Sequence, residues 1–224
     1  MTKIKLCGLK RSCDIDYVNT LMPDLIGFVF APGSKRFLSP DRASALRKHL
    51  KRGITPVGVF TDAAISEIEQ LAGSGTIEAV QLHGREDNQY IEALRRRVHC
   101  PVIQAFHIET TEDVKRAERS GADYIMLDSG GGTGKPFDHS LIGGIGREFF
   151  LAGGLDCENV GEAILKYHPY GVDVSSALET DGVKDFNKMA AFVKAVRYGE
   201  EAEKCKIKKE GSGYTGDSIF PKRS

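Results

Sequence analysis

Two residues of contrasting chemistry end predicted β-strands far apart in the sequence. Cys7 closes a short apolar run that begins at Lys3, and Asp128 closes another run just before a glycine-rich loop. Each has an ordinary explanation, because a strand cysteine is often a small buried hydrophobe and Asp before glycine is common in turns. A thiol and a carboxylic acid on two sides of one small molecule can also remove a proton at one atom and deliver one at another. That is the chemistry of a proton-transfer isomerisation.

Further polar residues follow other predicted strands. Arg36 lies in the loop after the second apolar run, His83 ends the fourth run, and Asp173 lies near the end of the eighth. The alternatives are plain surface charge for Arg36 and a hydrogen bond to a neighbouring loop for His83. Because the carboxyl ends of parallel strands meet at one face, all three are candidate substrate-binding residues.

Two turns favour binding of a phosphate group. Gly153 and Gly154 follow the seventh run and let the backbone approach an anion closely, while Ser175 and Ser176 follow the eighth and supply amides and hydroxyls. In βα barrels a phosphate frequently binds between the loops after the seventh and eighth strands. We add Gly132, from the glycine run after Asp128, as a further candidate for this site.

The elements that must position these residues alternate along the chain. Buried, β-branched runs of this kind are typical of parallel strands flanked by helices, in an open doubly wound sheet or a (β/α)8 barrel. Eight such units favour the barrel, which also brings Cys7 and Asp128 to one mouth. The eight runs are Lys3–Cys7, Leu25–Phe30, Pro56–Phe60, Ala79–His83, Val102–Phe106, Tyr124–Asp128, Phe149–Ala152 and Gly171–Ser175.

Helical stretches separate most of these runs. The sixth helix is poorly defined, because glycines at 130–134 and 143–144 interrupt its region. Each of the other amphipathic stretches begins near a residue that can cap the N-terminus of a helix, such as Asp or Thr. The expected starts lie near Pro40, Asp62, Asp87, Thr111, Asp156 and Asp185.

We predict one (β/α)8 barrel domain over residues 1–197, followed by a non-barrel C-terminal tail over residues 198–224. The tail carries a run of mixed charge and then few large apolar residues, which is typical of a flexible segment. The alternative is a docking segment anchored by Tyr214, Ile219 and Phe220, which would contact another enzyme of the same pathway.

Composition excludes several classes of protein. The 224 residues carry 31 Lys and Arg against 31 Asp and Glu, so there is no basic excess for nucleic acid. The sequence shows no signal region and no apolar run near the ~20 residues of a membrane helix, so we expect a cytoplasmic protein with no membrane partner. Five cysteines without a CxxC pair indicate free thiols. His107 and His168 have no partners at ligand spacing, so we predict no metal site.

Several strings in the chain, taken together, resemble the phosphoribosylanthranilate isomerase family. The match runs in order from about Lys3 to Arg197 and does not cover the tail. The strings are Lys5-Leu6-Cys7-Gly8-Leu9, Ser34-Lys35-Arg36-Phe37, Gln81-Leu82-His83-Gly84, Leu127-Asp128-Ser129, Gly131–Asp138, Leu151-Ala152-Gly153-Gly154-Leu155 and Val172-Asp173-Val174-Ser175-Ser176.

The resemblance implies an enzyme of tryptophan biosynthesis that needs no cofactor or metal. It would convert the aminoaldose phosphoribosylanthranilate to an aminoketose by an Amadori rearrangement. Asp128 would be the general acid that opens the ribose ring to a Schiff base, and Cys7 the general base that removes the C2 proton. The acid must start protonated and the thiol ionised, so we expect their surroundings to shift both pKa values.

The resemblance also implies how the substrate is held. Arg36 would bind the anthranilate carboxylate, to which its planar fork is suited, and Asp173 would contact the sugar hydroxyls. Gly154, Ser175 and Ser176 would bind the phosphate through backbone amides. Ala177 stands where the family usually has glycine, which costs affinity if that turn needs a positive φ.

Two rival functions stay open from the sequence. The first is an isomerase of the same fold acting on the histidine-pathway aminoaldose, but that enzyme type has an aspartate where this chain has Cys7. The second is a non-catalytic barrel that binds a phosphorylated ligand, although such a binder has no use for the pair Cys7 and Asp128.

Overall fold

A computed structural model describes residues 1–128, 142 and 145–211, with side chains up to Tyr198. Eight parallel strands form a closed barrel in which β1 pairs with both β2 and β8, so the open sheet is excluded. Each strand lies within one residue of its expected ends. The strands are β1 (Lys3–Cys7), β2 (Leu25–Val29), β3 (Thr55–Phe60), β4 (Ala79–Leu82), β5 (Val102–His107), β6 (Tyr124–Asp128), β7 (Phe149–Ala152) and β8 (Gly171–Val174).

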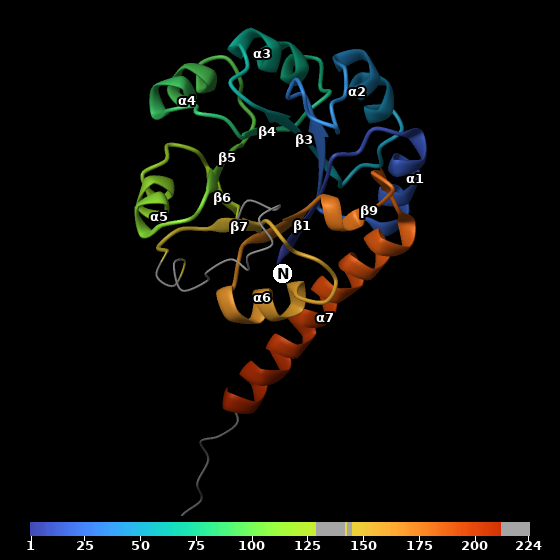
Figure 1. The fold of residues 1–224 in the computed structure, drawn as a ribbon, viewed down its shortest axis with the longest axis vertical. Coiled ribbons are helices and arrows are strands. Elements are labelled where there is room, and N and C mark those ends of the chain that lie inside the picture. The colour runs from blue at the N-terminus through green and yellow to red at the C-terminus, as the bar shows by residue number, and fades with distance from the viewer. Residues whose placement is uncertain (129–141, 143–144, 212–224) are drawn as a thin grey trace, which may run out of the picture.

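Helices surround the barrel on its outside (Figure 1). The first of them, α1, was not among the expected starts. The region between β6 and β7, where the sixth helix is poorly defined by sequence, lies almost wholly outside the described residues. The helices are α1 (Ser12–Leu21), α2 (Pro40–Arg47), α3 (Ile65–Gly73), α4 (Asn88–Arg95), α5 (Thr111–Glu118), α6 (Val160–Tyr167) and α7 (Phe186–Gly211).

Some expected helix starts are shifted because the predicted capping residue binds elsewhere. Asp87 does cap α4, its side chain accepting a hydrogen bond from the Tyr90 amide. Asp62 instead accepts from the amide of Arg85 and lies three residues before α3. The Asp156 side chain closes a local turn by accepting from the Asn159 amide, so α6 begins only at Val160.

The main core lies between the strands and the helices, and a smaller one lies inside the barrel. Alternate residues along each strand point to the two sides, so both faces of the sheet are buried. Glycine is needed on β2, because a Cβ at Gly27 would lie 2.5 Å from the Cys7 sulfur. The interior cluster consists of Val57, Ala79, Ile103, Ala105, Met126, Phe150 and Ala152.

The chain after β8 forms a short structure beside α1 before the last helix (Figure 1). A 3₁₀ turn, η2 (Ser176–Leu178), leads into a two-stranded hairpin of β9 (Glu179–Thr180) and β10 (Val183–Lys184). Then α7 packs against α6 and α1 and continues beyond the barrel (Figure 1). It ends at Gly211, well past the expected boundary at Arg197. Residues 212–224 of the expected tail lie outside the described part.

Candidate active site

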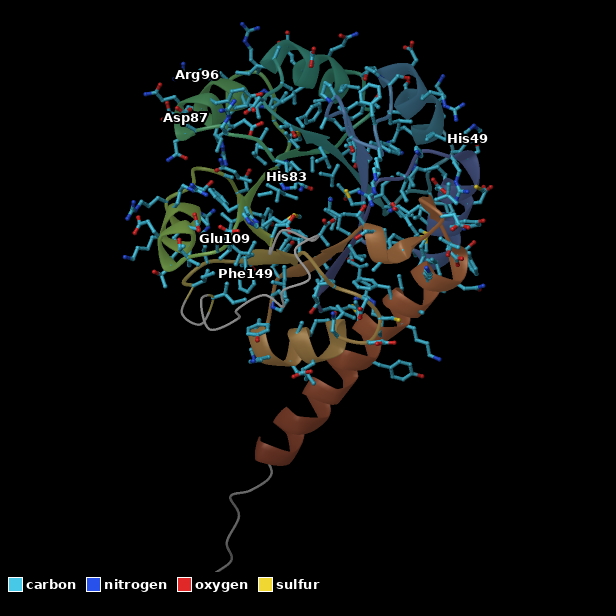
Figure 2. The ribbon with its side chains drawn as sticks, viewed as in Figure 1. His49, His83, Asp87, Arg96, Glu109 and Phe149 are labelled. Carbon is cyan, nitrogen blue, oxygen red and sulfur yellow. The ribbon has the colours of Figure 1, made fainter. Side chains whose placement is uncertain are left out.

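A cavity of about 360 Å³ opens at the carboxyl ends of the strands. It unites candidate residues that the sequence spreads over almost the whole barrel domain. In Figure 2, His83 lies toward the middle of the barrel, whereas Asp87, Arg96 and His49 lie on the surrounding helices and loops at the outside. Gly132 lies outside the described residues. The candidates that line the cavity are Cys7, Arg36, His83, Asp128, Gly153, Gly154, Asp173, Ser175 and Ser176.

Cys7 is buried at the end of β1, beneath the cavity. Burial raises the pKa of its thiol, and the positive charges of Lys5 and Lys184 oppose that rise. The Asp173 carboxylate acts in the same direction as burial. The thiol is therefore the favoured form near neutral pH, and the ionised base that the expected chemistry requires is the minor form.

Lys5 was not among the candidate residues, yet it places a buried positive charge beneath the site. Its side chain is 0% exposed, and its ammonium lies 2.7 Å from the Asp173 carboxylate. Burial by itself lowers the pKa of Lys5, but the Asp173 carboxylate, with a further contribution from the Cys7 sulfur when it is ionised, outweighs burial and raises that pKa. A period-2 reading of β1 could have found Lys5, since it lies two residues before Cys7 and therefore on the same face.

Asp128 lies at the end of β6, and its carboxylate is 3.7 Å from the Nε2 atom of His83 at the end of β4. Both side chains are partly exposed to the cavity. The contact brings together the predicted acid and a predicted binding residue. It also places the imidazole where it can influence the orientation of the carboxyl group.

Arg36 reaches the cavity from the loop between β2 and α2. Its Nε and Nη2 atoms donate to the two oxygens of Glu179, at 2.6 and 2.9 Å. The same carboxylate accepts from Lys184 at 2.6 Å. Glu179 and Lys184 were not predicted, because they lie in a short hairpin whose contact with Arg36 has no local sequence signal.

The turns after β7 and β8 have the open backbone that an anion needs. Gly153 and Gly154 have φ values of +84° and +67°, and an added Cβ at Gly154 would meet no atom within 4 Å. The Ser175 hydroxyl donates to the Cys7 carbonyl at 3.0 Å, which ties the two loops together. The φ angle of Ala177 is not positive. Alanine at this position therefore carries none of the backbone strain that a turn with positive φ would impose.

Within the described ranges, no group of three or more His, Cys, Asp or Glu side chains could hold a metal ion. In the same part of the chain, no helix is both long and apolar enough to cross a membrane. The cysteines with described side chains, Cys7, Cys13, Cys100 and Cys157, are all free thiols.

Fold and cavity together define a (β/α)8-barrel enzyme with its polar residues at the carboxyl ends of the strands. A family model described as N-(5'phosphoribosyl)anthranilate (PRA) isomerase matches residues 4–195. The chain therefore belongs to the phosphoribosylanthranilate isomerase family, as the sequence motifs predict.

Individual relatives agree with this assignment. The N-(5'-phosphoribosyl)anthranilate isomerase of Endomicrobium trichonymphae is 44% identical over 202 residues, covering 88% of this chain and 99% of the relative. That of Caldanaerobacter subterraneus is 41% identical over 204 residues, covering 88% and 98%.

Solved structures of the same family also match over most of the chain. The phosphoribosyl anthranilate isomerase of Thermotoga maritima has 35% identity and a TM-score of 0.81, and the match covers 88% of this chain and all of that one. Another was solved with reduced 1-(o-carboxyphenylamino)-1-deoxyribulose 5-phosphate. It has 34% identity and a TM-score of 0.80, with the same coverage.

Proposed function

We propose that this chain converts N-(5'-phosphoribosyl)anthranilate to 1-(o-carboxyphenylamino)-1-deoxyribulose 5-phosphate in tryptophan biosynthesis. One observation carries the residue assignment: Cys7 from β1 and Asp128 from β6 line the same cavity. Closure of the barrel brings a sulfur base and a carboxylic acid to one substrate-sized space, which an acid–base isomerisation requires.

The proposed reaction begins with proton donation from Asp128 to the ring oxygen of the ribose. The ring C–O bond breaks and the C1–N bond becomes a protonated Schiff base. The Cys7 thiolate then removes the proton from C2, and the electron pair moves to give an enolamine. Tautomerisation of the enolamine yields the ketone: C1 gains the proton held by the Cys7 thiol, and the proton of the C2 hydroxyl passes to the Asp128 carboxylate. Cys7 and Asp128 thereby return to the thiolate and carboxylic acid with which these steps began.

The buried cations beneath the site help the thiol to ionise. Burial favours the neutral thiol, whereas Lys5 and Lys184 favour the thiolate. A thiol with a raised pKa ionises less often, but its thiolate is a stronger base than the thiolate of a thiol with a lowered pKa. Once formed, the Cys7 thiolate is therefore better able to remove a proton from carbon. The resting site thus holds a neutral thiol within reach of two ammonium groups.

Binding of the substrate is assigned to the remaining residues of the cavity. Arg36 binds the carboxylate of the anthranilate ring, while His83 and Asp173 contact the sugar portion. Backbone amides of Gly153, Gly154, Ser175 and Ser176 bind the phosphate, for which the positive φ values after β7 and the turn after β8 are suited. Gly132 belongs to this phosphate site in the proposal, although it lies outside the described residues. No cofactor or metal takes part.

Turnover assays decide between this function and its rivals. Phosphoribosylanthranilate is generated in solution and the loss of its fluorescence is followed after the protein is added, which the absence of tryptophan makes straightforward. The histidine-pathway aminoaldose is tested in parallel. Turnover of the first substrate supports the proposal; turnover of the second alone, or of neither by folded protein, refutes it in favour of the corresponding rival.

We place the reaction in the cytoplasm and assign the tail beyond the barrel no part in chemistry. Residues 198–224 would at most contact a neighbouring enzyme of the same pathway. None of the proposed catalytic residues comes from this segment, which is the reason for separating the two roles.

A further inference from the structure

We propose that Glu179 is a positioning residue that fixes the guanidinium of Arg36 for the substrate carboxylate, and that Lys184 gives this cluster the net positive charge it needs. The inference rests on the proposed function, in which Arg36 binds that carboxylate. It assigns a specificity role to the hairpin of β9 and β10, which supplies both residues.

The Arg36–Glu179 contact uses one edge of the guanidinium. Nε donates to Oε1 at 2.6 Å and Nη2 donates to Oε2 at 2.9 Å, so the two planar groups meet side by side. A guanidinium carries five N–H groups in a rigid fork, and the edge that includes Nη1 is not used in this pair. Glu179 therefore fixes the plane of the fork while leaving an edge that suits a second carboxylate.

Charge explains why Lys184 is required. Its side chain is 2% exposed and its ammonium lies 2.6 Å from Glu179, so Arg36, Glu179 and Lys184 together carry one net positive charge. Burial alone would raise the pKa of Glu179, but hydrogen bonds from Arg36 and Lys184 keep it below its usual range. An Arg–Glu pair without the lysine would be neutral and would attract a substrate anion less strongly.

The hairpin holds the two charged residues in register. Lys184 pairs directly with Glu179 across β9 and β10. The turn between them contains Asp181 and Gly182, both with positive φ, as a two-residue hairpin turn of type I′ requires. Lys184 also donates to the Ser175 carbonyl at 2.8 Å, which anchors the hairpin to the end of β8.

The Arg36 side chain packs in space against Gly8, the residue that follows the reactive Cys7. A Cβ added at Gly8 would lie 2.4 Å from Cδ of Arg36, so the arginine side chain passes directly over the backbone that follows Cys7. Ser175, which accepts from Lys184, in turn donates to the Cys7 carbonyl at 3.0 Å. A change in the angle of Arg36 would therefore move the bound aromatic ring relative to the base.

Two ligands that differ by one group test the inference. The first is reduced 1-(o-carboxyphenylamino)-1-deoxyribulose 5-phosphate, and the second is the same compound without the ring carboxyl. Their affinities for the full chain are measured by isothermal titration calorimetry for Glu179→Gln, Lys184→Met, Arg36→Met and the double variant Arg36→Met/Glu179→Gln. Glu69→Gln, in the exposed pair with Arg97, is the matched control.

We expect Glu179→Gln and Lys184→Met each to lower the affinity for the carboxylated ligand by about tenfold and the affinity for the carboxyl-free ligand by less than about twofold. When Arg36 is already replaced by Met, Glu179→Gln should not lower the affinity any further, because Glu179 acts through Arg36. In turnover, Glu179→Gln should raise KM more than it lowers kcat. Lys184→Met keeps the test valid if Glu179→Gln fails to fold.

Equal weakening of both ligands by Glu179→Gln would show a merely structural role, and unchanged affinity for both would show none; either overturns the inference. If Arg36→Met does not discriminate between the ligands, the carboxylate role of Arg36 fails and the inference fails with it, even in an active enzyme. Absence of turnover by the parent protein is a separate result that refutes the proposed function.

Discussion

The ammonium of Lys5 lies 2.7 Å from the carboxylate of Asp173, and this ion pair joins the first and last strands of the barrel beneath Cys7. The two residues are directly opposite each other in the β1–β8 register. β1 and β8 are the strands whose pairing closes the barrel. The same ion pair therefore links these two strands and places a positive and a negative charge next to the Cys7 thiol.

That ion pair should contribute strongly to stability. Removing Lys5 leaves the largely buried Asp173 carboxylate without its partner. Because Asp173 still borders the cavity, Lys5→Met is expected to lower the free energy of unfolding by about 3 kcal/mol, the lower end of the range for a broken buried pair. Lys5→Met/Asp173→Leu, which removes both charges, should cost less than the single change. Urea unfolding measures both, with Glu69→Ala in an exposed pair as the control, expected to cost at most about 1 kcal/mol. A double variant less stable than Lys5→Met would contradict this.

Turnover should depend on both members of the acid–base pair. Cys7→Ala and Asp128→Asn are each expected to lower kcat by about 10²- to 10⁴-fold, the usual contribution of a positioned acid or base. Circular dichroism shows whether each variant keeps its fold. A folded variant with the full parental rate would mean that the residue concerned has been assigned the wrong role.

The thiol of Cys7 should react slowly with alkylating reagents at neutral pH. Burial raises its pKa, so the midpoint of its alkylation rate against pH should lie above the value of a free thiol, about 8.5. Lys5→Met removes an opposing positive charge and should move the midpoint higher still. Peptide mapping by mass spectrometry separates Cys7 from exposed Cys157, whose alkylation should not respond to Lys5→Met. A midpoint below about 8.5 would contradict the stated direction.

Replacing Ala177 by glycine, the residue that the sequence motifs lead us to expect at this position, should bring no gain in phosphate affinity. Ala177 lies in the turn η2 without a positive φ, so alanine is unstrained there. Ala177→Gly is expected to change affinity for the reduced product analogue by less than about twofold and to lower stability by about 0.5–1 kcal/mol. Calorimetry and urea unfolding check the two expectations. A marked gain in affinity would show that the alanine obstructs the phosphate.

Deletion of residues 199–224 should leave turnover nearly unchanged. The described contacts of α7 with the barrel, such as the hydrogen bond of Arg197 to the Thr2 carbonyl, come before this point. The activity of the truncated chain and its assembly size by light scattering are measured together. A large loss of activity with the fold intact would give the segment a part in catalysis, whereas a change in assembly size alone would indicate a docking role.

The strands and most of the polar residues of the candidate site can be predicted from local patterns in the sequence. Parallel strands are buried on both faces, so each appears as a short apolar run whose ends a local pattern locates to within one residue. Polar residues at their carboxyl ends, such as Asp128, then identify the face that carries the site.

The charges that surround the reactive groups become apparent only in the folded barrel. Lys5 and Asp173 are 168 residues apart, and Arg36 and Glu179 are 143 apart, so no local pattern pairs them. The direction in which the pKa of Cys7 shifts likewise depends on burial and on neighbouring charges that closure of the barrel brings together. Periodicity reports which side of its own element a residue occupies, whereas ion pairs and desolvation depend on distances between elements, which exist only in the folded chain.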